Sequence, residues 1–126
     1  MKFKLININT SSDTDLAIGT HYQSEIDIAP KKLTETFGWP NSGDGYKVSG
    51  EYLFKSEKPV PNNCNNCDIF TLYDWKWTTW YDKDNTYTPK QFWKLTNPIR
   101  FHIGGKSKQY IHDFKQWLYS TVDYKS

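Results

Sequence analysis

The sequence predicts a single α+β domain over residues 1–126, in which a mainly antiparallel sheet of about five strands carries two or three helices on one face. The length of 126 residues suits one ordinary domain and is too short for two. The net charge is only +2 and 17% of the residues are aromatic, so buried rings can build the core that a modest aliphatic content would not. Alternating and helical hydrophobic patterns follow one another along the chain in the order β-β-α-β-β-α-β-α.

The strands are predicted where apolar and polar side chains alternate. The segment 46–54 has one largely aromatic and one mostly polar face, as a half-buried antiparallel strand requires. The segment 69–77 is apolar on both sides at its start, which predicts a central strand. Between these two, residues 58–67 form a long Pro- and Asn-rich loop insertion. The other expected strands are residues 2–7, 22–28 and 99–103.

Three helices are predicted from their end signals. Pro30 can occupy the first turn of a helix over residues 31–37, which Gly38 would end. Thr88 is expected to cap a short helix that runs to about Leu95. Ser107 is expected to cap the last helix, whose apolar stripe would bury one face. That stripe consists of Tyr110, Ile111, Phe114, Trp117 and Leu118.

Charge and hydropathy exclude several classes of protein. No stretch is apolar enough for a membrane span, and the opening MKFKLININT lacks the apolar core of a secretion signal, so we expect an intracellular protein that is not secreted. The chain has sixteen basic and fourteen acidic residues and a pI of about 8.4. This near balance disfavours duplex nucleic acid as a partner. No motif indicates a cofactor.

The two cysteines, Cys64 and Cys67, lie in the polar segment PNNCNNCD. A structural zinc site needs four ligands, and one C-x-x-C pair supplies two, so no metal site is expected. A redox pair would follow a strand and begin a helix, which this loop does not do. We therefore expect two free thiols in a loop of a reduced compartment.

A strand-to-helix turn is one candidate anion site. It contains Gly104, Gly105, Lys106 and Ser107, where free backbone N–H groups and the positive end of the last helix could face an anion. The alternative is that the glycines only turn the chain and Ser107 only caps the helix.

A second candidate lies on the polar faces of three expected strands: Lys47 with Ser49, Asp74 with Lys76, and Arg100 with His102. If these strands are neighbours, the six side chains form one cluster. Its cations would bind an anion, while Asp74 would orient His102 as an acid or base. The alternative is a solvated sheet face with scattered ion pairs.

The segment 73–81 interleaves aromatic residues with polar ones. Its rings can stack on bases or sugars, or form a protein interface at Trp75, Trp77, Trp80 and Tyr81. They can equally fill the core, so the sequence leaves open whether this segment is core or surface.

The motifs GDGYKVSGEYLF, FTLYDWK and FHIGG, together with the terminal DFKQWL, resemble a family of small proteins encoded by phages and large DNA viruses. The resemblance covers about residues 20–118. It implies a viral, intracellular setting (host cytoplasm or nucleus, with the virion as an alternative) and no particular activity.

The function expected from these features is binding rather than catalysis: a viral-type protein that sequesters a host protein or a small anionic ligand such as a nucleotide. One alternative is a small hydrolase or phosphotransfer enzyme that uses His102 and Asp74. Another is a virion structural component, for which a homo-oligomer would be expected.

Overall fold

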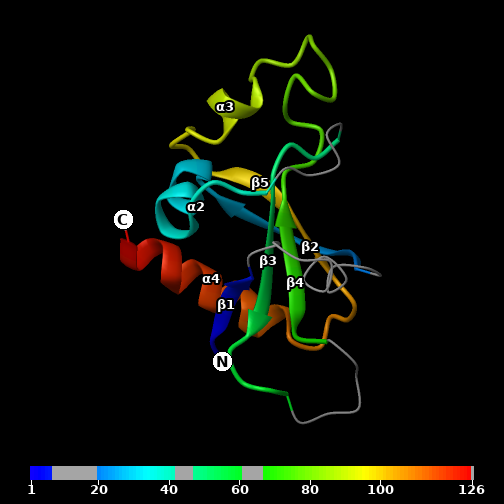
Figure 1. Ribbon diagram of the computed structural model, residues 1–126, viewed down its shortest axis with the longest axis vertical. Helices are drawn as coiled ribbons and strands as arrows, with labels where there is room; N and C mark the ends of the chain where they lie inside the picture. The colour runs from blue at the N-terminus through cyan, green and yellow to red at the C-terminus, as the bar shows by residue number, and fades with distance from the viewer. Residues whose placement is uncertain (7–19, 42–46, 61–66, 126) are drawn as a thin grey trace.

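A computed structural model describes residues 1–6, 20–41, 47–60 and 67–125. Within these residues, five strands and three helices follow the predicted order (Figure 1). The strands are β1 (Phe3–Ile6), β2 (His21–Ile28), β3 (Glu51–Ser56), β4 (Ile69–Tyr73) and β5 (Ile99–Gly105). The helices are α2 (Pro30–Phe37), α3 (Pro89–Phe92) and α4 (Ile111–Lys125). The α+β fold class is confirmed.

The strands form one antiparallel sheet in the order β1-β3-β4-β5-β2. The predicted central place of β4 is confirmed, since β3 and β5 flank it. β2 lies at one edge against β5, with a register shift between Tyr22 and Ser24. This shift places Tyr22 opposite Gly104 and therefore on the same face of the sheet as His102.

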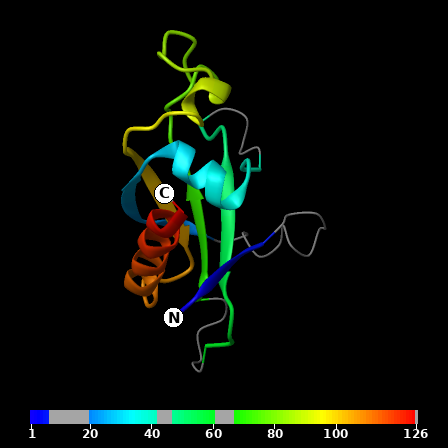
Figure 2. The ribbon, with the colours of Figure 1, turned by 90° about the vertical axis from the view of Figure 1, so that its left-hand side faces the viewer.

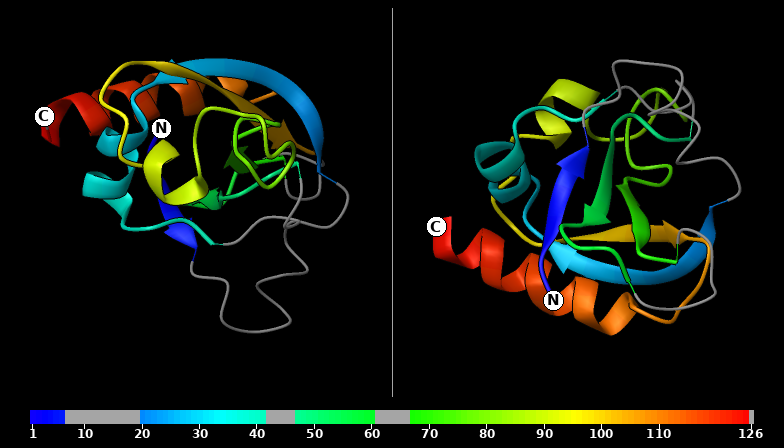
Figure 3. Two further views of the ribbon diagram at one scale, coloured as in Figure 1. Left: turned by 90° about the horizontal axis from the view of Figure 1, so that it is seen from above. Right: turned by 60° about the horizontal axis from the view of Figure 1, so that its bottom comes forward.

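Helices α2 and α4 cover one face of the sheet, α4 running past β2 (Figures 2 and 3). The core between the layers is largely aromatic: Phe70 stacks on Phe114 at 4.8 Å between ring centroids, and Phe3 meets Phe114 edge-on at 5.3 Å. Large rings thus supply the buried surface that the sequence predicted they would. None of the helices in the described part of the chain is long and apolar enough to cross a membrane.

The helix ends match the predicted signals in two cases. Gly38 ends α2 with φ of 82°, a conformation that favours glycine. Thr88 and Gln91 form a capping box at α3, which ends at Phe92, short of the predicted Leu95. The prediction for the last helix is wrong at its start: α4 begins at Ile111, and the Ser107 hydroxyl accepts a hydrogen bond from the Gln109 N–H instead.

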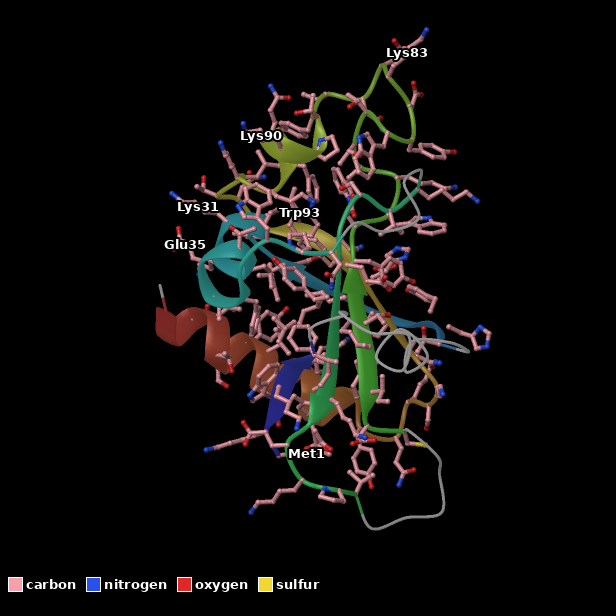
Figure 4. All side chains as sticks on the ribbon, in the orientation of Figure 1. Met1, Lys31, Glu35, Lys83, Lys90 and Trp93 are labelled. Carbon is pink, nitrogen blue, oxygen red and sulfur yellow. The ribbon has the colours of Figure 1, made fainter. Side chains whose placement is uncertain are left out.

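Two strands are shorter than their alternating pattern predicts. β3 begins at Glu51, so residues 47–50 precede the strand, and β4 ends at Tyr73. The segment that follows β4, residues 75–88, leaves the sheet and leads to α3; we call it the aromatic lobe. It extends beyond the end of the sheet, with Lys83 at its far end and Trp93 at its base (Figure 4).

Candidate functional site

The sheet face that α2 and α4 leave uncovered carries a group of aromatic rings. Tyr73 and His102 are paired across β4 and β5, with ring centroids 5.7 Å apart. Their neighbours Leu72 and Phe101 point into the core, so alternation turns Tyr73 and His102 to the uncovered face. The ring of Tyr22 meets His102 edge-on at 4.8 Å.

Trp75 extends this group beyond the end of β4. Its ring lies nearly parallel to that of His102, at 5.6 Å and 18°. The Nζ atoms of Lys47 and Lys76 lie 5.6 and 5.5 Å from the centroid of the Trp75 ring. A backbone hydrogen bond of 2.6 Å, from the Lys76 N–H to the Lys47 carbonyl, holds the two lysine segments together. Two cations beside a stack of rings suit a ligand with a planar ring and a negative charge.

A hollow of about 240 Å³ opens beside Trp75, which we call the sheet hollow. Gly104 contributes to it because it has no side chain: a Cβ at this position would overlap the Thr71 hydroxyl. The described residues that line the hollow are Thr20, His21, Val48, Glu51, Thr71, Tyr73, Trp75 and Gly104. It therefore combines aromatic walls with hydroxyl and carboxylate acceptors and an imidazole.

Burial changes the titration of the rings around the hollow. Loss of water lowers the pKa of His102 from its ordinary value of 6.5, and Glu25 opposes that change only in part. His102 is therefore a neutral, flat ring at pH 7, suited to stacking. Burial also raises the pKa of Tyr73, with a further contribution from the charge of Glu51.

Asp74 does not orient His102, so the predicted acid–base pair is wrong. One residue beyond Tyr73, Asp74 points to the opposite side, where it is fully buried. Its Oδ1 accepts hydrogen bonds from the backbone N–H groups of Ser49 and Gly50 (2.8 and 2.9 Å), and its Oδ2 accepts one from the Ser49 hydroxyl (2.7 Å). The Trp93 indole N–H donates to the same hydroxyl at 3.2 Å. Asp74 thus anchors the segment that carries Lys47.

The predicted polar cluster of six side chains is also divided by the structure. Ser49 is buried with Asp74 instead of facing a ligand. The Nε atom of Arg100 lies 3.2 Å from Asp27 and 3.4 Å from Glu25, so acidic side chains of the edge strand already neutralise its charge. Only Lys47, Lys76 and His102 come together, around Trp75.

The predicted anion turn after β5 is divided as well. Gly104 contributes to the sheet hollow, whereas Gly105 pairs with Phe70 and its carbonyl accepts a hydrogen bond from the Gln23 amide at 2.9 Å. Lys106 follows the strand but precedes the first residue of α4 by five positions, so the positive end of that helix does not begin beside it.

The aromatic lobe answers the question that the sequence left open about residues 73–81. Only Tyr73 belongs to the sheet; Trp77 and Trp80 are 38% and 42% exposed. The Trp77 indole donates to the Arg100 carbonyl at 3.3 Å, and the Nζ of Lys76 lies 5.1 Å from the Tyr81 ring. Trp77 and Trp80 are therefore surface side chains of the lobe and not part of the core.

The cysteine prediction is wrong for Cys67, while Cys64 lies outside the described residues. Cys67 directly precedes the buried Asp68 and is itself fully buried, and it is part of a disulfide bond. The Asp68 carboxylate accepts a hydrogen bond from the Ser56 hydroxyl, which closes this end of the β3–β4 hairpin. The loop insertion therefore ends in a packed junction.

Several residues of the sheet hollow were missed from the sequence, among them His21, Glu51 and Thr71. The sequence does show that Thr71 and Tyr73 share a strand face. It does not show that β5 pairs with β4 and that β2 pairs with the other edge of β5, which is what brings Gly104 and His21 to them.

A larger hollow of about 510 Å³ lies at the other end of β3, near Lys2, Lys58 and Tyr110. The described residues that line it do not form a stack of rings like the one beside the sheet hollow. Within the described ranges, no three His, Cys, Asp or Glu side chains gather as metal ligands. No family model matches the sequence, and no curated protein is similar enough to count as a relative.

Proposed function

We propose that this protein is a non-enzymatic binding module that takes up a small anionic ligand of the nucleotide class on the sheet face opposite α2 and α4. The observation that carries the proposal is the pair of lysines, Lys47 and Lys76, beside the stacked Trp75 and His102 rings. Stacking of one base on an aromatic side chain contributes roughly 1–3 kcal/mol. Two neighbouring ammonium groups add charge-assisted contacts to a phosphate.

The charges divide the ligand between two positions. Glu51 lines the sheet hollow, and its carboxylate would repel a phosphate placed there. A base fits this hollow better, because its ring can lie against aromatic walls and its amino groups can donate to oxygen acceptors. The phosphate then lies outside the hollow, toward Lys47 and Lys76.

The size of the sheet hollow fits one part of a ligand, such as a single base, and not a complete larger ligand. Pockets for complete drug-sized ligands usually measure about 300–1,000 Å³, and the sheet hollow, at about 240 Å³, lies below that range. The near balance of charge, +2 overall, also argues against long duplex nucleic acid, which needs a basic stripe.

Calorimetric titration with AMP tests this proposal. Replacing Lys47 and Lys76 together by Met removes two charges and keeps most of each aliphatic stem. We expect this double variant to bind AMP at least about tenfold more weakly, equivalent to roughly 1.4 kcal/mol. The matched control replaces Lys2 and Lys58 by Met beside the other hollow and should leave AMP binding unchanged.

Trp75→Ala gives a second readout, with Trp39→Ala as its control because Trp39 is 58% exposed and does not line the hollow. Loss of AMP binding only in Trp75→Ala would support stacking. No AMP binding to the unchanged protein at about 1 mM ligand would exclude the proposal, since affinities weaker than that yield less than roughly 4 kcal/mol.

The alternatives from the sequence have unequal support. An enzyme that pairs His102 with Asp74 has none, because the carboxylate bonds to Ser49 and Gly50. A protein partner has some, because Trp77 and Trp80 are partly exposed. The viral, intracellular setting, a host protein as partner and a role in the virion stay predictions of the resemblance.

A further inference from the structure

A third hollow, of about 390 Å³, lies in the aromatic lobe, and we call it the lobe hollow. Its lining residues are Trp75, Lys76, Trp77, Asn85, Thr86 and Tyr87. Trp75 is the one described residue that lines both this hollow and the sheet hollow. The two hollows are therefore neighbours that share a tryptophan as a common wall.

The lobe hollow is held in shape by its own backbone. The Asn85 side-chain amide donates to the carbonyls of Lys76 and Thr78, at 3.2 and 2.9 Å. The Thr79 N–H donates to the Tyr87 carbonyl at 2.8 Å, which joins the two sides of the lobe. Lys76 adopts a positive φ of 63°, so the chain turns sharply between Trp75 and Trp77. A loop tied in this way presents a fixed surface to a ligand.

The chemistry of the lobe hollow repeats that of the sheet hollow. Trp77 and Tyr87 supply rings on which a second planar group can stack. Asn85 and Thr86 are polar, and Lys76 belongs to this hollow while its Nζ also lies 5.5 Å from the shared Trp75 ring. Cationic charge is thus placed at the boundary between two ring-binding hollows.

We propose that the two hollows together bind a dinucleotide unit: one base in each hollow, with the connecting phosphodiester beside Lys47 and Lys76 at Trp75. This inference rests on the proposed function and extends it from one nucleotide to two. The shared wall supports it, because one phosphodiester must join two rings that lie close together. A free dinucleotide and one step of a single strand have the same chemistry, so both are compatible with the site.

The test compares the affinities of the phosphorylated diadenylate pApA and of AMP by calorimetry. We expect pApA to bind at least tenfold more tightly than AMP. Trp77→Ala, which removes one wall of the lobe hollow, should abolish most of this advantage while AMP affinity changes less than twofold. Trp80→Ala is the matched control, because Trp80 belongs to the same lobe but does not line the hollow.

A second variant tests the lobe hollow independently, in case Trp77→Ala does not fold. Thr86 is exposed, so Thr86→Glu should fold normally and place a negative charge at the lobe hollow. It should weaken pApA at least fivefold more than AMP. Equal affinities for pApA and AMP in the unchanged protein, or an advantage that survives in folded Trp77→Ala and Thr86→Glu, would overturn the inference.

The outcomes separate the two proposals. Binding of AMP without preference for pApA refutes the dinucleotide inference and keeps the proposed function, whereas absence of binding to both ligands refutes both. An oligoadenylate of ten nucleotides distinguishes a free dinucleotide from one step of a single strand. Binding per site as tight as for pApA supports a single strand, and clearly weaker binding supports a free dinucleotide.

Discussion

Replacing Asp74 by Ala should lower the free energy of unfolding by much more than the position of Asp74, just after the end of a strand, suggests. The carboxylate is fully buried and is the acceptor for two backbone N–H groups, of Ser49 and Gly50. It also accepts the Ser49 hydroxyl, which in turn accepts the Trp93 indole N–H. Alanine leaves these donors buried without this acceptor, so the perturbation reaches the aromatic core through Trp93.

The size of the effect follows from these bonds. Each buried backbone N–H left unsatisfied costs about 1–3 kcal/mol, and the two together cost roughly 2–5 kcal/mol when partial relaxation is allowed. The Ser49 hydroxyl also loses its acceptor, which adds to this cost. Against a total stability of about 5–15 kcal/mol, such a loss is large. Asp74→Asn should cost only about 1–2 kcal/mol, since the amide oxygen still accepts both N–H groups.

Urea unfolding followed by circular dichroism measures both variants against the unchanged protein. Asp84→Asn is the control: Asp84 is exposed in the aromatic lobe, and a surface change of this kind stays within about 0.5 kcal/mol. A shift below about 1 kcal/mol for Asp74→Ala, at unchanged slope, refutes the anchoring role. A stable Asp74→Ala that no longer binds AMP would show that Asp74 positions the site without stabilising the fold.

Two further predictions concern His102 and Gly50. Burial lowers the pKa of His102 in the folded protein, with Glu25 acting against it, so between that pKa and the ordinary value of 6.5 the unfolded chain binds more protons. The free energy of unfolding should therefore fall as the pH drops below about 6.5 through the pKa of His102 in the folded protein. The variant His102→Gln should flatten this part of the pH profile of urea midpoints. A profile that is unchanged in the variant would contradict the lowered pKa of His102. A Cβ at Gly50 would lie 2.5 Å from Trp93 and 2.6 Å from Pro40. Gly50→Ala should thus lower the free energy of unfolding by about 1–3 kcal/mol, measured against the exposed Glu57→Ala, and equal midpoints would contradict it.

Element order and most helix ends could be predicted because they depend on local chemistry. Pro30 with Gly38, and Thr88 with its capping box, act through their own backbone, and α2 and α3 form where they indicate. Alternation of buried residues likewise located β2 and β5 to within two residues. These patterns carry their information in neighbouring positions, so no knowledge of the fold is needed to interpret them.

The candidate site was predicted only in part because its geometry depends on where strands end. The alternation of residues 46–54 and 69–77 continues beyond β3 and β4, and extending it placed Ser49 and Asp74 on the same face as His102. In the structure, the Asp74 carboxylate accepts hydrogen bonds from the N–H groups of Ser49 and Gly50. These donors are therefore not available to a neighbouring strand, and β3 begins at Glu51. A side chain from a distant segment decides the boundary, and alternation cannot show this.

The same buried carboxylate connects the fold to the proposed site. By fixing Ser49 and Gly50, Asp74 sets the path of the chain just after Lys47, whose carbonyl accepts the Lys76 N–H. The positive φ of Lys76 turns the chain directly after Trp75, whose ring stacks on His102 and also lines the lobe hollow. The uncharged amide of the Asp74→Asn variant should hold this arrangement with AMP affinity nearly unchanged, because the role is to accept two N–H groups and not to carry charge. Asp74 is therefore a positioning residue whose contribution to binding passes entirely through Lys47 and Trp75.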